Sequence, residues 1–275
     1  IKHQAQSKRL QLFELILAQK QLSDEHAAET IYHRIPASSF SQLKRRLKDD
    51  ILTVLMICPI EKAYQSENIK AEFKARKMLM QGKILLSRGV YDEAVEILNK
   101  ASQLTDKYEL ASMSVEIQDL LRTHIGVKKG LDQYQAYHQS LHRNLEVQQR
   151  EIEAKDFNHE IMIPSLHSAD HSTQNPAADD RLNTLRHDFE TSGSARIGFW
   201  YYMSAIKMQI NHRRYEAAYR YGLQLASLID HEPAIHTVPN RAGIHMELAK
   251  ILIHLGQFDE AIEMAGEARK LFLSG

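Results

Sequence analysis

The chain has 275 residues, 43% hydrophobic and 25% charged, and its 35 basic and 35 acidic side chains leave no formal net charge. This balance argues against nucleic-acid binding, because such proteins ordinarily carry a basic excess that displaces counterions from phosphate. The single cysteine, Cys58, excludes an internal disulfide framework and is compatible with a reducing compartment, so we expect a cytoplasmic protein.

Residues 1–58 read as an N-terminal segment of three helices. Residues 10–17 are strongly apolar, and Ser23 can cap a second helix that stops before Pro36. A third helix begins near Ser38, and its expected buried stripe is Leu43, Leu47, Ile51 and Leu55. The longest apolar run, residues 51–60, is too short to span a bilayer, so no membrane partner is expected.

The remaining chain reads as successive helices with one interruption. Helical periodicity runs over residues 61–88, 91–104, 108–124 and 131–155, with glycines at 126 and 130. Residues 161–178 lose the periodicity and collect Pro, Ser, Asn and Asp, which predicts a loop or linker. Helices resume from residue 179 to the C-terminus, with a start at Ser194. The chain opens on Ile rather than Met, which is typical of a fragment.

One pattern recurs three times, with an aromatic residue followed three positions later by alanine at the start of a helix. The three copies are Gly89-Val90-Tyr91-Asp92-Glu93-Ala94, Arg213-Arg214-Tyr215-Glu216-Ala217-Ala218 and Gly256-Gln257-Phe258-Asp259-Glu260-Ala261. Fixed small and aromatic residues at helix–turn–helix junctions are typical of stacked helical repeats. Small residues allow two helices to cross closely, and the aromatic fills the space beside them.

These residues resemble the tetratricopeptide-repeat family, and uncharacterised bacterial helical-repeat proteins in particular. The strongest matches are Gly82, Leu85, Gly89, Tyr91, Ala94, Leu98 and Ala101, and then Ala249, Leu252, Gly256, Phe258, Ala261, Ala265 and Ala268; a weaker one is Ala205, Tyr215, Ala218, Gly222 and Leu225. The resemblance implies an all-α, irregular right-handed solenoid of antiparallel helix pairs. Residues 61–160 and 179–275 would form one continuous array.

Catalytic signatures are absent from the sequence, and we expect neither an enzyme nor a cofactor. His138 and His142 lie four apart on an expected helix, so both imidazoles could face a metal, but no third ligand follows from the spacing. His167 and His171 fall in the expected loop. We therefore predict no metal site, and an enzyme centred on the histidines is the weakest of three readings.

Two other clusters have ordinary explanations. The basic runs at 44–48 and 70–77 are interrupted or followed by acidic residues, as on a solvated helix face. Phe199, Trp200, Tyr201 and Tyr202 point around a full helix circumference, so some should pack between repeats while others, Trp200 among them, could face a groove.

Aligning the three junctions brings out a shared register. In tetratricopeptide arrays the first helix of each pair lines the concave groove, and one groove position here is always lysine. The aligned residues are Lys83, Lys207 and Lys250, preceded by Leu79, Met203 and Met246 and followed by Leu86, Ile210 and Ile253. A lysine between apolar residues suits an extended peptide with acidic and hydrophobic side chains, although such lysines can also simply extend past a packed stripe.

The sequence therefore predicts a non-catalytic scaffold that binds a peptide or helix in the concave groove of a tetratricopeptide-like array. The alternative is a bacterial regulator whose helical repeats sense a ligand and control an attached domain. An enclosed pocket would favour the regulator, whereas an accessible face carrying the aligned lysines would favour the scaffold.

Overall fold

The structure, a computed structural model, describes residues 7–18, 22–33, 37–57, 66–167 and 176–274. All regular secondary structure within these ranges is α-helical, as the composition predicts, and it comprises twelve helices. The chain divides into two compact units, Ile1–Ile60 and Glu61–Gly275. Cys58, Pro59, Pro36 and His171 lie outside the described residues.

The first unit contains three helices around a small core. Its helices are α1 (Lys8–Ala18), α2 (Asp24–Tyr32) and α3 (Ala37–Ile57). The Ser23 side chain accepts a hydrogen bond from the backbone N–H of His26, as expected of an N-cap. The core residues are Leu12, Ala27, Ala28, Ile31, Phe40, Leu43 and Leu47. The expected stripe on α3 is half wrong, because Ile51 and Leu55 extend beyond this core and are 38% and 59% exposed.

The second unit contains the other nine described helices. They are α4 (Glu67–Ser87), α5 (Tyr91–Lys107), α6 (Ala111–Lys129), α7 (Leu131–His167), α8 (Pro176–Ser192), α9 (Ala195–Asn211), α10 (Tyr215–His231), α11 (Val238–His254) and α12 (Phe258–Ser274). The predicted loop over 161–178 is too long, because α7 continues to His167 and α8 already begins at Pro176. Ile161 of α7 packs against a hydrophobic cluster, and proline is tolerated in the first turn of a helix such as α8.

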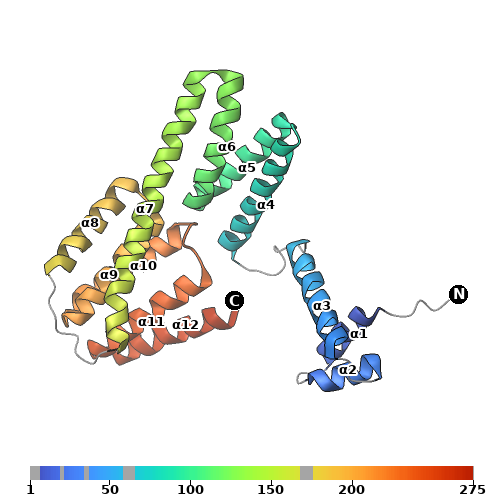
Figure 1. The fold of residues 1–275 in the computed structure, drawn as a ribbon. Helices are drawn as coiled ribbons and strands as arrows, with labels where there is room; N and C mark the ends of the chain where they lie inside the picture. The colour runs from blue at the N-terminus through green and yellow to red at the C-terminus, as the bar shows by residue number, and fades with distance from the viewer. Residues whose placement is uncertain (1–6, 19–21, 34–36, 58–65, 168–175, 275) are drawn as a thin grey trace. The chain divides into compact units, whose positions relative to one another are not determined.

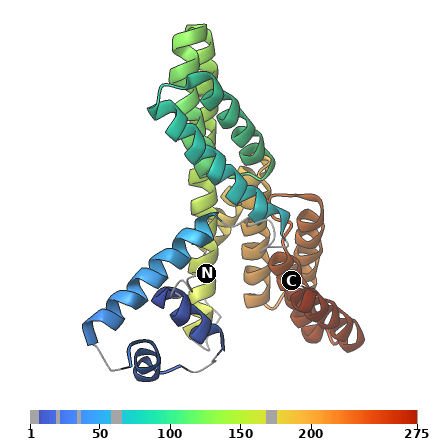
Figure 2. The same cartoon turned by 90° about the vertical axis from the view of Figure 1, so that its right-hand side faces the viewer.

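Most helices of this unit pack against the next helix in the chain (Figure 1). The long helix α7 runs beside α6 over its first half, and both views show this (Figure 2). Further along, α7 contacts α8 and α9. The cores follow the same division: one cluster is centred on α4, α5 and α6, another on α9, α10 and α11, and a third joins α7 and α8 to α9.

The turns between helices explain the recurring sequence pattern. The residue two positions before the aromatic adopts a left-handed conformation, with φ of 75° at Gly89, 57° at Arg213 and 76° at Gly256. In each turn the next backbone N–H bonds to a carbonyl five residues earlier, closing the preceding helix. These bonds are Val90 N to Leu85 O at 3.0 Å, Arg214 N to Gln209 O at 2.8 Å and Gln257 N to Leu252 O at 3.0 Å.

A fourth copy of this turn joins α5 to α6, where Glu109 stands at the position of the glycine and Ala111 at the position of the aromatic residue. Glu109 has φ of 48°, and Leu110 N bonds to Thr105 O at 2.8 Å. Left-handed backbone is unfavourable for a residue with a Cβ atom. Glu109 therefore stands in a strained position, and its side chain accounts for its presence there, as shown below.

The small residues of the pattern lie where helices meet. Five alanines from the repeat matches are at most 4% exposed: Ala94, Ala101, Ala218, Ala261 and Ala268. At Gly82 on α4, an added Cβ would come within 2.6 Å of Leu98 on α5. The two helices can approach this closely only because residue 82 lacks a side chain.

Candidate functional site

The structure separates the aligned lysines and their neighbours into two groups. On α4, Leu79 is 7% exposed and belongs to the core, so it cannot line an open groove. Leu86 also packs against that core, while Lys83 forms an ion pair with Glu116 of α6. The prediction of Leu79 as a groove residue is therefore wrong, because core and groove residues share the same helical period.

On α9 and α11 the same spacing leaves more surface accessible. We call these residues the lysine rows, which are Met203, Lys207 and Ile210 on α9, and Met246, Lys250 and Ile253 on α11. The row on α9 is half-buried, and its apolar members pack against the α9–α11 core. On α11, Met246 and Ile253 are 38% and 53% exposed.

The two row lysines differ in their partners. The Lys250 ammonium lies 2.7 Å from Glu247, three residues earlier on the same helix. Lys207 has no ion-pair or hydrogen-bond partner among the described residues. An exposed pair within one helix contributes little free energy, so both ammonium groups could accept a carboxylate from another molecule.

The aromatic cluster on α9 mainly packs within the chain. Tyr201 is 5% exposed, and burial followed by the neighbouring Tyr221 raises the pKa of its hydroxyl. Trp200 is half-buried, with its ring edge-on to Phe199 at 5.1 Å and to His159 at 6.0 Å between centroids. Trp200 therefore contacts α7 while retaining some accessible surface.

The paired histidines lie beside a positive charge. His138 Nδ1 lies 3.0 Å from the guanidinium of Arg122, and the His138 and His142 rings meet edge-on at 4.4 Å between centroids. A cation beside the imidazole opposes metal binding. Within the described ranges, His, Cys, Asp and Glu side chains do not gather in threes suitable for a metal ion.

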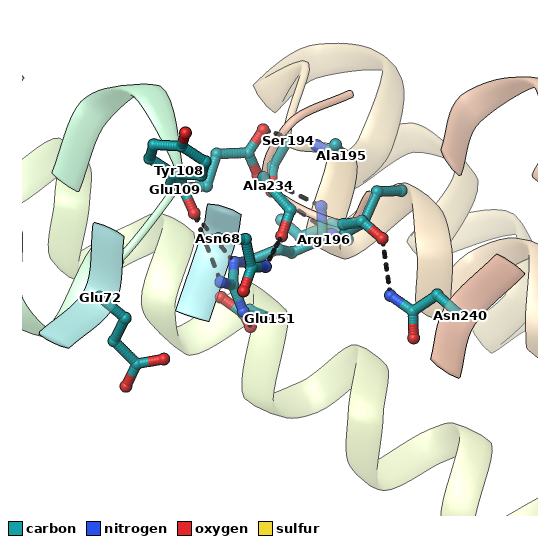
Figure 3. Close-up of polar contacts among 12 residues, drawn as sticks. Asn68, Glu72, Tyr108, Glu109, Glu151, Ser194, Ala195, Arg196, Ala234 and Asn240 are labelled. Atoms are coloured by element: carbon teal, nitrogen blue, oxygen red, sulfur yellow. Dashed lines mark hydrogen bonds and ion pairs between the residues drawn. The ribbon is translucent and has the colours of Figure 1, made fainter. Parts of the chain in front are cut away.

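A polar cluster at the start of α9 was not foreseen from the sequence (Figure 3). The Glu109 carboxylate accepts hydrogen bonds from Ser194 Oγ at 2.7 Å, from Ala195 N at 2.9 Å and from Arg196 N at 3.2 Å. Ser194 Oγ in turn accepts from Ile197 N at 3.3 Å. Glu109 thus caps the first turn of α9 from the α5–α6 turn and places negative charge at the positive end of the helix.

Arg196 ties further elements to this cluster. Its guanidinium donates to the Tyr108 carbonyl at 3.3 Å and lies 3.6 Å from Glu151 of α7. Burial raises the pKa of Glu151, an effect that Arg196 opposes and Glu109 reinforces. We call Tyr108, Glu109, Glu151, Ser194, Ala195 and Arg196 the polar junction.

A second long-range contact lies close to the polar junction (Figure 3). Asn68, in the first turn of α4, donates to the Ala234 carbonyl between α10 and α11 at 2.8 Å. Asn240 donates to the neighbouring Ile235 carbonyl, also at 2.8 Å. The start of α4 is therefore held against the turn before α11, although 166 residues separate the two partners.

A shallow hollow lies between α5, α6 and α7. Its volume is about 400 Å³, and it is open to solvent rather than enclosed. Amide and hydroxyl side chains dominate its lining, which consists of Asn99, Ser102, Gln103, Gln118, Ala136, Tyr137 and Ser140. The hollow lacks the enclosure that holds a small ligand tightly.

These features define an all-α protein whose described helices form a small N-terminal unit and a larger unit of successively packed helices. None of the helices described is both long and apolar enough to cross a membrane. Comparisons with protein-family models, with curated proteins and with solved structures found no match.

Proposed function

We propose that the second unit is a tetratricopeptide-like, right-handed solenoid of antiparallel helix pairs that binds a peptide through its lysine rows. The peptide carries acidic and hydrophobic side chains. Its carboxylates meet Lys207 and Lys250, and its apolar side chains cover the methionine and isoleucine beside each lysine. The protein acts as a non-catalytic scaffold.

The recurring turn and the close helix contacts support this architecture. The same left-handed turn closes α4, α5, α9 and α11, so the backbone enters the following helix in a similar way each time. Glycine or alanine then allows close helix contact, as at Gly82 and also at Gly222, whose added Cβ would lie 2.6 Å from Leu248.

The observation that carries the proposal is the duplicated row itself. Met–Lys–Ile occurs with identical spacing on α9 and α11, and each row keeps accessible surface in the folded chain. Methionine is unbranched and polarizable, so it adapts to varied apolar partners. Lys207 is half-buried and has no ion-pair partner within the described part of the chain, so an added carboxylate gains most there, because partial burial strengthens the attraction.

A peptide titration tests the proposal. The probe alternates glutamate with leucine, and its matched counterpart replaces every glutamate with lysine. Trp200, the single tryptophan, lies on α9 and reports binding through its fluorescence. We expect the acidic peptide alone to bind, and Lys207→Glu with Lys250→Glu to weaken it by roughly tenfold or more.

Lys100→Glu is the charge-matched control for either row substitution made singly, because Lys100 also pairs with a glutamate on its own helix, Glu96 at 2.6 Å, but lies on α5 outside the rows. This variant should bind the acidic peptide like the unaltered protein. If the control and the row variant lost the same affinity for the acidic peptide, the loss would come from the change in net charge and not from the lysine rows. Equal binding of both peptides would overturn the proposal.

A further inference from the structure

A set of uncharged hydrogen-bonding side chains lines the hollow between α5, α6 and α7. The set comprises three amides and three hydroxyls, which are Asn99, Gln103, Gln118, Ser102, Tyr137 and Ser140, and Ala136 completes the lining. Amides and hydroxyls can both donate and accept hydrogen bonds. Because none of these lining residues carries a charge, the hollow favours a neutral ligand with its own donors and acceptors over a phosphate, a carboxylate or a metal ion.

Hydrogen bonds hold part of this lining in place. The Gln118 amide of α6 donates to Ser102 Oγ of α5 at 3.3 Å. The Asn144 amide of α7 donates to Ser114 Oγ of α6 at 2.8 Å. Burial raises the pKa of the Asp106 carboxyl, against hydrogen bonds from Ser102 and Ser114 that lower it. These contacts join the three helices that form the hollow, and side chains fixed before a ligand arrives lose less conformational entropy when it binds.

Gln118 is the lining residue that points most directly to a ligand. It is 6% exposed, yet its Oε1 has no hydrogen-bond partner among the described residues. Its hydrogen bond to Ser102 is also long, at 3.3 Å. Leucine, of similar size, would serve packing between α5 and α6 better, because an unpaired buried acceptor is unfavourable. A ligand hydroxyl in the hollow could supply the missing hydrogen once the amide turns slightly toward it.

The rest of the hollow suits a ring with an apolar face. Tyr137 is half-buried and packs against the core of α4, α5 and α6, so part of its ring remains accessible. A sugar ring has C–H groups that can cover this surface and hydroxyls around its edge that can reach the amides. The volume of about 400 Å³ lies within the range of small-molecule sites. The open side leaves room for the next unit of a sugar chain.

We propose that this hollow binds a neutral sugar. The amides of Asn99 and Gln118 exchange hydrogen bonds with the sugar hydroxyls, and the ring of Tyr137 contacts the apolar face of the sugar ring. A peptide backbone offers only one N–H and one C=O for each residue, fewer groups in the same space than the hydroxyls of a sugar ring. The site lies on α5, α6 and α7, whereas the lysine rows lie on α9 and α11, so sugar binding is independent of the proposed peptide binding.

A nuclear magnetic resonance titration of the full chain tests the proposal, because it observes the side-chain amide groups of asparagine and glutamine directly. The probes are glucose, galactose, mannose and N-acetylglucosamine, and tetraglycine is the peptide counterpart. We expect at least one sugar to shift the side-chain amide signals of Asn99 and Gln118 saturably, with a dissociation constant on the order of 1 mM because the site is open. Tetraglycine should leave these signals unshifted.

Gln118→Leu separates a binding role from a structural one. It removes the amide at nearly the same side-chain volume and also removes the unpaired buried acceptor. The dissociation constant of the sugar should rise by about tenfold or more, while the melting temperature stays the same or rises. Gln149→Leu is the matched control and should leave that constant unchanged, because Gln149 is an exposed glutamine of α7 outside the lining that donates to Glu153 at 2.8 Å.

Asn99→Ala is a second variant, which carries the test alone if Gln118→Leu does not fold. Asn99 is half-buried on α5, and its loss should raise the dissociation constant of the sugar by about fivefold or more without unfolding the protein. Three results would overturn the proposal. They are no saturable shift with any of the four sugars up to about 100 mM, the same shifts with tetraglycine, and unchanged sugar affinity in a folded Gln118→Leu or in Asn99→Ala.

Discussion

Two residues with the same strained backbone are predicted to respond in opposite ways to substitution by glycine. Arg213 and Glu109 both adopt left-handed conformations, with φ of 57° and 48°. Glycine removes the strain at either position, but it also increases the entropy of the unfolded chain. Arg213 is exposed, and its side chain makes no hydrogen bond or ion pair with other described residues, so Arg213→Gly should stabilise the protein by about 0.5–1 kcal/mol.

Glu109→Gly relieves the same strain but removes the cap of α9. The carboxylate accepts three hydrogen bonds, two of them from backbone N–H groups of the first turn. Hydrogen bonds to charged groups contribute roughly 1.5–3 kcal/mol each, and water replaces part of that at this half-buried site. Allowing a loss of about 2–4 kcal/mol and a gain of up to about 1 kcal/mol, the net destabilisation is about 1–4 kcal/mol.

Equilibrium unfolding in urea, followed by circular dichroism and by Trp200 fluorescence, measures both variants. Glu109→Gln is the control that separates strain from capping, because it keeps the non-glycine residue and one amide oxygen acceptor. Its stability should fall, but by less than that of Glu109→Gly. The reasoning is refuted if both glycine variants shift the free energy of unfolding in the same direction.

Two further predictions concern buried groups. Burial raises the folded-state pKa of Glu151 above 4.5, so the charged carboxylate destabilises the folded protein at pH values above that raised pKa, and this destabilisation fades as the pH falls toward 4.5. The stability that Glu151→Gln gains over the unaltered protein should therefore decline between about pH 7 and pH 4.5, as measured by paired urea titrations. A difference that stays flat or rises as the pH falls would contradict this. Gly82→Ala should destabilise by about 1–3 kcal/mol because its Cβ would meet Leu98, whereas Gly243→Ala, with nothing within 4 Å, should stabilise by about 0.5–1 kcal/mol; equal melting shifts would refute the packing argument.

The helices could be predicted because their signals are local. Ser23 and Ser194 each begin a helix and accept a hydrogen bond from its first turn, as expected from the residues that follow them. The turn at Glu109 could not be predicted, because its stabilising contact is not local. Left-handed turns are recognised from glycine, and here a partner 85 residues away in the sequence holds a glutamate in that conformation.

The candidate site was less predictable than the fold. Leu79, Met203 and Met246 occupy the same register, yet Leu79 is in the core and Met246 is exposed. Helical periodicity gives the position of a residue around one helix, but it does not say which neighbouring helix covers that position. The lysines share this ambiguity, since Lys83 pairs with Glu116 of α6, whereas Lys207 has no such partner in the ranges that the structure describes.

The polar junction also determines how the lysine rows are presented. The first core is built on α4, α5 and α6, and the row helices α9 and α11 belong to a different core. Besides helix α7, directional hydrogen bonds link these regions, from Glu109 to the start of α9 and from Asn68 to the turn before α11. Apolar packing is non-directional, whereas a hydrogen bond fixes both distance and angle. The position of both row helices against α4–α6 therefore depends on these polar groups as well as on α7, so loss of the polar groups should weaken the proposed peptide binding before either core unfolds.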